Sequence, residues 1–150
     1  MIAYQLSIFA ENKPGKLAQV TGVLAKEKIN IRATTIATAD TFGVVNLIVD
    51  DPKRAEAALA KAGMTAHLRE VLAILIPDKP GGLNNLTQLL HQEGININNA
   101  YGFVLEGSKK AVFVVDVDQM ERTEKLLEKH GFQTLDTAAL SAIEPSHSVK

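Results

Sequence analysis

The chain repeats itself, and this repeat constrains its fold more than any other feature. The tripeptide Lys-Pro-Gly at 13–15 returns at 79–81, and Ile-Asn-Ile at 29–31 returns at 95–97. Both copies lie 66 positions after the originals. Self-similarity at a fixed spacing is the sign of a duplicated structural unit.

The repeat extends over most of both halves. Residues 11–50 match 77–116 at 12 of 40 positions without a gap. Further along, Leu59 to Gly63 match 127–131 at a spacing of 68, so two residues were inserted between these segments. We therefore predict two units within the 150 residues, at 1–70 and 71–150.

Hydrophobic spacing predicts the same order of elements in each unit. In residues 4–10, apolar side chains alternate with Gln5 and Ser7, which is typical of a half-buried strand. Leu17, Val20 and Leu24 then recur at helical spacing, and we expect a helix of about four turns. In the first unit the remaining elements are strands at 29–37, 42–50 and 65–71 and a helix at 52–63.

In the second unit we expect strands at 71–76, 95–104, 110–116 and 132–137 and helices at 81–94 and 119–131. The order βαββαβ predicts an α+β fold of two ferredoxin-like units, each an antiparallel sheet with its helices packed on one face. Residues 139–143 are expected to add a short strand or cover a sheet edge, and 145–150 to form a mobile tail.

Several strands are almost continuously apolar, which is typical of strands covered on both faces. The clearest are 43–49, 71–76 and 111–115. No linker rich in Gly, Ser or Pro separates the two units. We therefore expect the units to pack closely within the chain, and the remaining apolar surface to form a homodimer.

Composition excludes several classes of function. The formal net charge is -1 and aromatic residues make up 5% of the chain, which argues against a nucleic-acid or anionic-membrane partner. There is no cysteine and no apolar segment of membrane-spanning length, so we expect a cytoplasmic protein.

Catalytic patterns are also missing. The four histidines show neither an i, i+4 pair nor a neighbouring carboxylate at metal-ligand spacing, and no nucleophile elbow or phosphate loop is present. We expect no metal, no cofactor and no enzymatic activity. The alternative is a small ferredoxin-like enzyme with an unrecognised active site at the unit interface.

The two strand-to-helix corners carry a resemblance to a known family. The segment "ENKPGKLAQVTGVLAKEKINI" and its copy "PDKPGGLNNLTQLLHQEGINI" are similar to the opening of the ACT domain, the small regulatory module of amino-acid metabolism. The resemblance covers nearly the whole chain and implies a tandem, stand-alone ACT protein. It also implies a sensor that binds a free amino acid between paired modules and regulates a metabolic enzyme.

The chemistry of the corners agrees with this implication. The first turn of a helix has backbone N–H groups without intrahelical partners, so it can hold a carboxylate. Asn and Asp side chains can accept hydrogen bonds from an ammonium group. By resemblance, the ligand contacts Asn12 or Asp78 at a corner and Asn30 or Asn96 on another module. The full set of expected ligand-binding residues is Asn12, Pro14, Gly15, Lys16, Leu17, Asn30, Asp78, Pro80, Gly81, Gly82, Leu83 and Asn96.

Structural roles compete with these assignments. Asn or Asp two residues before Pro-Gly is a common turn residue, whose side chain bonds to nearby backbone. Lys13 and Lys79 could steer a carboxylate or simply be solvated. Tyr101 and Phe103 could line a specificity pocket or serve in packing.

Overall fold

The computed structural model describes residues 1–143, which form two compact units. The first unit comprises Tyr4–Arg69, and the second comprises Met1–Ala3 together with the chain from Glu70 onward. The predicted tail at 145–150 lies outside the described residues.

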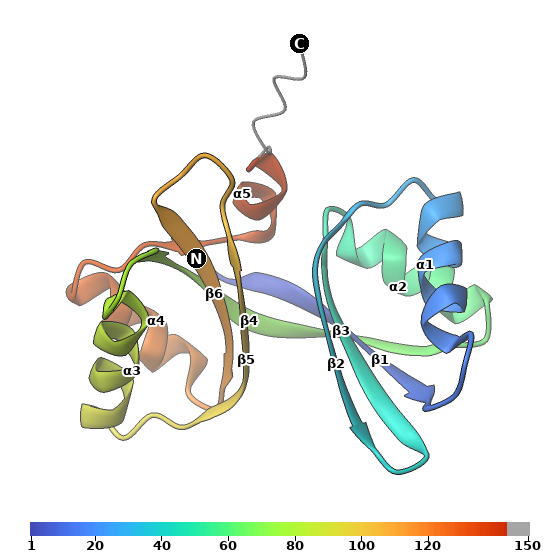
Figure 1. Cartoon of the computed structure of the whole chain (residues 1–150), viewed down its shortest axis with the longest axis horizontal. Helices are drawn as coiled ribbons and strands as arrows, with labels where there is room; N and C mark the ends of the chain where they lie inside the picture. Colours follow the sequence, from blue (N-terminus) through green and yellow to red (C-terminus); the bar gives the residue numbers. More distant parts are fainter. Residues whose placement is uncertain (144–150) are drawn as a thin grey trace. The chain divides into compact units, whose positions relative to one another are not determined.

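The first unit contains four strands and two helices in the predicted order (Figure 1). Its strands follow the spatial order β2-β3-β1-β4, with β3 antiparallel to both β1 and β2. The elements are β1 (Ala3–Glu11), α1 (Lys16–Lys26), β2 (Ile31–Ala39), β3 (Phe42–Val49), α2 (Pro52–Lys61) and the first part of β4 (Thr65–Pro77).

The second unit repeats this arrangement. The second half of β4 is its first strand, and the spatial order is β7-β4-β6-β5. The elements that follow β4 are α3 (Gly82–Gln92), β5 (Ile97–Val104), β6 (Lys110–Val117), α4 (Met120–Lys129), β7 (Thr134–Leu135) and α5 (Thr137–Ala142). The ferredoxin-like α+β prediction is confirmed.

Register and core packing show how closely the two units correspond. The pairing of β2 with β3 shifts between Ile31 and Ala33, and that of β5 with β6 shifts between Ile97 and Asn99, 66 positions later. Each core lies between one face of the sheet and both helices. Equivalent residues of the two cores are Ile8 and Ile74, Val20 and Leu86, Leu24 and Leu90, and Leu59 and Leu127.

Three details differ from the sequence prediction. Helix α1 has 11 residues, about three turns rather than four, because the chain leaves helical geometry at Lys28, which has a φ of 55°. The last strand shrinks to Thr134–Leu135. Residues 139–143 belong mostly to a short helix, α5, rather than to a strand, because the Asp136 carboxylate accepts from the N–H of Ala139 over 2.8 Å and caps it.

Candidate functional site

Each corner between the first strand and first helix of a unit turns at a left-handed glycine. Gly15 has a φ of 88° and Gly81 a φ of 86°, a conformation that favours glycine, and each immediately precedes its helix. Neither helix has a side-chain cap. The lysine-proline-glycine repeat therefore encodes the same turn twice.

These corners leave backbone donors free. In α1 the N–H of Lys16 bonds to Lys13 O over 3.4 Å and that of Gln19 to Gly15 O over 2.9 Å. Within residues 1–143, the N–H groups of Leu17 and Ala18, and those of Leu83 and Asn84 in α3, have no backbone or side-chain acceptor. They form two equivalent positive helix ends at which a carboxylate can bind.

An exposed leucine stands beside each free pair of N–H groups. Leu17 is 40% exposed and Leu83 is 42% exposed, although both belong to amphipathic helices whose other leucines reach the core. The two side chains therefore provide matching apolar contacts at the two corners.

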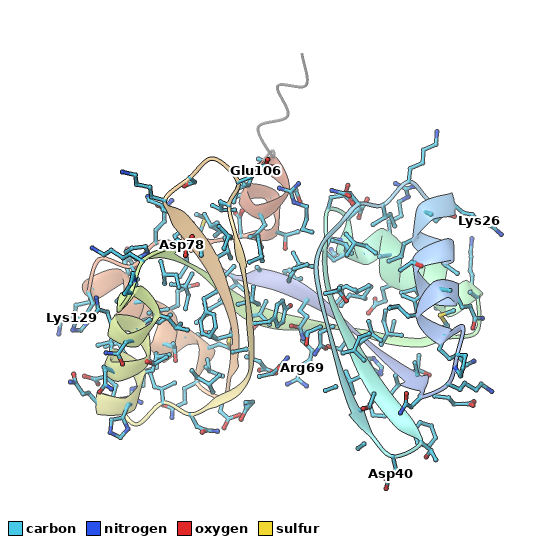
Figure 2. The ribbon with its side chains drawn as sticks, viewed as in Figure 1. Lys26, Asp40, Arg69, Asp78, Glu106 and Lys129 are labelled. Carbon is cyan, nitrogen blue, oxygen red and sulfur yellow. The ribbon has the colours of Figure 1, made fainter. Side chains whose placement is uncertain are left out.

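Asn12 makes two hydrogen bonds to a distant hairpin that the sequence did not predict. Its backbone N–H donates to Thr41 O over 2.7 Å, and its side-chain amide donates to Asp40 O over 3.1 Å. Both acceptors lie in the turn between β2 and β3, and Figure 2 shows Asp40 at the tip of that hairpin. The amide of Asn12 thus joins the corner to the hairpin through one of its two N–H groups.

Asp78 is bound only through its backbone. Its N–H donates to Lys109 O over 2.8 Å, in the corresponding hairpin of the second unit. Within the described chain its carboxylate makes no hydrogen bond or ion pair. The carboxylate is therefore available to a ligand, whereas the Asn12 amide keeps its oxygen as an acceptor but already uses one N–H within the fold.

The second corner is also tighter than the first. A Cβ atom added to Gly82 would lie 2.1 Å from the Pro77 carbonyl oxygen, so the helix begins directly against the end of β4. Lys16 occupies the equivalent position in the first unit. The first residue of α1 therefore carries a charged side chain, whereas the first residue of α3 carries none.

Asn30 and Asn96 lie at the other end of each unit. Because β2 runs parallel to β1, and β5 parallel to β4, the start of the second strand is distant from the corner that follows the first (Figure 1). The backbone of Asn30 exchanges hydrogen bonds with Asp50, and the Asn96 amide donates to Asn98 Oδ1 over 3.2 Å. No single unit brings a corner and its asparagine together.

Both units contain a pocket that the sequence did not predict. It lies between the end of the first strand, the start of the first helix and the turn after the second helix, with a volume of about 440 Å³ in the first unit and 420 Å³ in the second. The first is lined by Glu11, Lys16, Gln19 and Met64, whose counterparts are Pro77, Gly82, Asn85 and Phe132.

The titrating groups beside the corners differ in environment. The Lys13 ammonium lies 2.9 Å from the Glu11 carboxylate, and this hydrogen bond, with the charges of Lys13 and Lys16, lowers the pKa of Glu11. Burial raises the pKa of Tyr101, which shares the helix-free face of β5 with Phe103. Tyr101 and Phe103 are both half-buried.

Comparison with known proteins identifies the family. The sequence model of the family described as the ACT domain pair matches residues 1–143. The chain belongs to this family. A crystal structure of protein BT0572 from Bacteroides thetaiotaomicron is 36% identical to this ACT domain pair, with a TM-score of 0.88, and the match covers 95% of this chain and 97% of that one. A search of curated proteins found no match.

More distant structures share the fold of this ACT domain pair. The regulatory subunit of aspartate kinase from Thermus thermophilus, in its ligand-free form, is 18% identical with a TM-score of 0.60, over 87% of this chain and 97% of that one. The corresponding subunit from Thermus flavus is 18% identical with a TM-score of 0.55, over 85% and 95%.

No group of three or more His, Asp or Glu side chains in residues 1–143 is arranged to hold a metal. No helix in this range is long and apolar enough to cross a membrane.

Proposed function

We propose that this ACT domain pair is a non-catalytic sensor of a free amino acid, acting in the cytoplasm to regulate a metabolic enzyme. One observation carries the proposal: each unit presents unpaired helix N–H groups at a corner beside an exposed leucine. Such a corner suits a carboxylate with an apolar group next to it.

The ligand ammonium needs acceptors that one corner does not supply alone. The Asp78 carboxylate, which makes no bond within residues 1–143, is suited to this role at the second corner. Asn30 lies at the far end of its own unit, so its participation requires a corner from another module. We propose composite sites in which Asn12 works with Asn96 or its symmetry mate, and Asp78 works with Asn30.

Composite sites imply paired modules, and we propose a homodimer. Strands β2 and β5 are edge strands, because each has a hydrogen-bonded neighbour on one side only. The side chain of Ile36 on β2 is 48% exposed. An exposed strand edge with apolar side chains favours association with another module. A ligand bound between modules would change how they pair and so report its concentration to a regulated enzyme.

The test is a thermal-shift screen of the protein against the twenty amino acids. A ligand at 100 times its dissociation constant adds about 2.7 kcal/mol to the free energy of unfolding. The N-acetylated form of any hit is the control, because acetylation removes the ammonium charge. If no amino acid raises the melting temperature, the sensor function is rejected.

A further inference from the structure

The pocket inside the first unit has charges suited to a ligand of its own. We propose that it binds a free α-amino acid with an apolar side chain, the ammonium group pairing with Glu11 and the carboxylate with Lys16. The proposal rests on the amino-acid sensing proposed above, but it places a site within one ACT unit, apart from the composite sites between modules.

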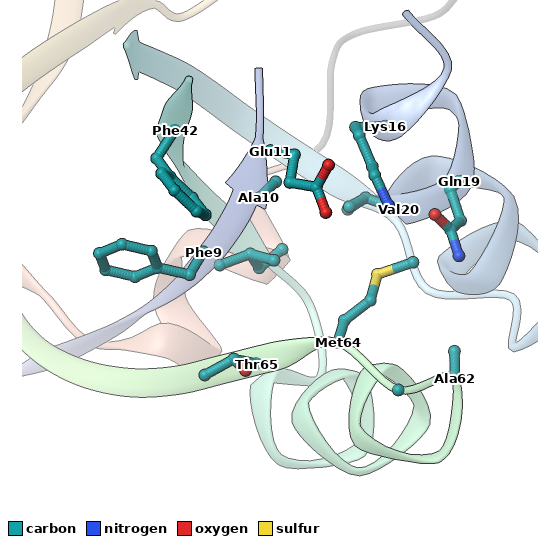
Figure 3. Close-up of a pocket in the computed structure, with 12 residues that line it drawn as sticks. Phe9, Ala10, Glu11, Lys16, Gln19, Val20, Phe42, Ala62, Met64 and Thr65 are labelled. Carbon is teal, nitrogen blue, oxygen red and sulfur yellow. The ribbon is translucent and has the colours of Figure 1, made fainter. Parts of the chain in front are cut away.

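The two charged groups converge on the pocket from different elements. Glu11 ends β1 and Lys16 begins α1, and Figure 3 shows the Glu11 carboxylate turned toward α1 and the Lys16 side chain. Lys16 is close enough to contribute to the lowered pKa of Glu11. The mouth therefore offers a carboxylate to a ligand ammonium and a lysine side chain to a ligand carboxylate, the two partners that a zwitterion requires.

Lys13 is the third charged group at this mouth and already pairs with Glu11 over 2.9 Å. Both side chains of this pair are more than half exposed. Exposed ion pairs contribute little to stability, so a ligand ammonium can share or replace the Lys13 contact at small cost. Gln19, one turn after Lys16, adds an amide that can donate to the ligand carboxylate.

The floor of the pocket is apolar. Ile8 and Val20, which are 0% and 1% exposed, close its base. The half-buried Met64, which points upward between β1 and α1 in Figure 3, is the one of these three side chains that a ligand can reach. A methionine thioether adapts readily to different apolar partners. The volume of about 440 Å³ lies within the range of small-molecule sites. These features favour an aliphatic or thioether side chain over a charged one.

The second unit provides an internal comparison. There Pro77 and Gly82 replace Glu11 and Lys16, so neither charge of the pair remains at its position. Phe132 replaces Met64, and the remaining charged lining, Lys109 and Lys110, is basic. We therefore expect one such ligand per chain, bound only in the first unit.

Titration calorimetry with leucine and methionine as probes tests this assignment on the full chain. Glu11→Gln and Lys16→Met each remove one charge while keeping the side chain's length. Ala62→Trp fills the pocket from an exposed position at the end of α2, and His130→Trp is its counterpart in the second unit. Leucinamide and N-acetyl-leucine, each lacking one charge, serve as control ligands.

We expect the first three variants each to weaken binding by about tenfold or more, the loss typical of a charged hydrogen bond, and His130→Trp to leave it unchanged. Leucinamide and N-acetyl-leucine should bind the unaltered chain at least as weakly as leucine binds these three variants. If leucine or methionine binds but Asn30→Ala or Asn96→Ala abolishes binding while Glu11→Gln and Ala62→Trp do not, the pocket is rejected and the sensor function stands. If no amino acid binds the unaltered chain, both proposals are rejected.

Discussion

The guanidinium group of Arg122 donates to the backbone carbonyl of Glu93 over 2.9 Å and lies 3.4 Å from the carboxylate of the same residue. Arg54 makes the same two contacts with Glu27 in the first unit. In each unit the second helix thus satisfies a carbonyl at the end of the first helix, which would otherwise lack a partner.

Removing this contact should destabilise either unit. We expect Arg122→Ala and Arg54→Ala each to lower the free energy of unfolding by about 1 kcal/mol, measured by urea denaturation, because the bond is charge-assisted but half exposed. Glu93→Gln keeps the carbonyl bond and should change stability by less than about 0.5 kcal/mol. Wild-type stability in both arginine variants would show that water replaces the contact fully.

Two glycine substitutions should have opposite effects. Gly82→Ala forces a Cβ against the Pro77 carbonyl, and we expect a loss of about 1–3 kcal/mol, as for other overpacked sites. Gly22 lies within α1 with open space around it, so Gly22→Ala should raise stability by about 0.5–1 kcal/mol. Thermal unfolding of the two variants measures both effects, and equal shifts would contradict the close approach at the second corner.

The two corners should respond differently to alanine. Asp78→Ala removes a carboxylate without a partner in residues 1–143, so it should spare stability and weaken one class of ligand site by about 10- to 150-fold. Asn12→Ala breaks the bond to the Asp40 carbonyl and should cost about 1 kcal/mol of stability. Calorimetry and denaturation on both variants separate these effects. If neither variant changes a binding isotherm, the corners are turns only.

The C-terminal helix should contribute to stability although it has only six residues. Leu140 is 2% exposed, and we expect Leu140→Ala to cost about 2–5 kcal/mol. Asp136→Ala removes the helix cap and should cost about 1 kcal/mol. Deletion of residues 145–150 is the control and should leave the melting temperature unchanged. If this deletion lowers the melting temperature as much as Leu140→Ala does, the stabilising role of α5 is contradicted.

The titration of Glu11 should be shifted to low pH. The Lys13 hydrogen bond and the charges of Lys13 and Lys16 favour the ionised carboxyl, so its NMR titration midpoint should fall below the ordinary value of 4.5. This favourable interaction is present above the unfolded-state pKa and is lost as pH falls through the lower folded-state pKa. Lys13→Met should move the midpoint upward more than Lys16→Met does, and the reverse order would contradict the contact.

Local pattern predicted much of this protein. The spacing of Leu17, Val20 and Leu24 indicated a helix, and the repeat of Lys-Pro-Gly indicated that the same corner occurs twice. A short strand was expected at 139–143 because "AALSAI" resembles the apolar strand "VLAILI". Apolar content alone does not distinguish a short helix from a short strand. This segment is helical because the Asp136 carboxylate accepts a hydrogen bond from the N–H of Ala139 and caps the helix.

The sequence by itself determined the duplication, the order of elements and the turns at Gly15 and Gly81, because these depend on periodicity and on backbone conformations encoded by neighbouring residues. Only the tertiary structure decided which polar groups are already occupied. Asn12 bonds to a carbonyl 28 positions away, whereas the Asp78 carboxylate makes no bond within residues 1–143. The pocket between Glu11, Lys16 and Met64 likewise arises only when the sheet brings distant segments together, because its walls are not neighbours along the chain.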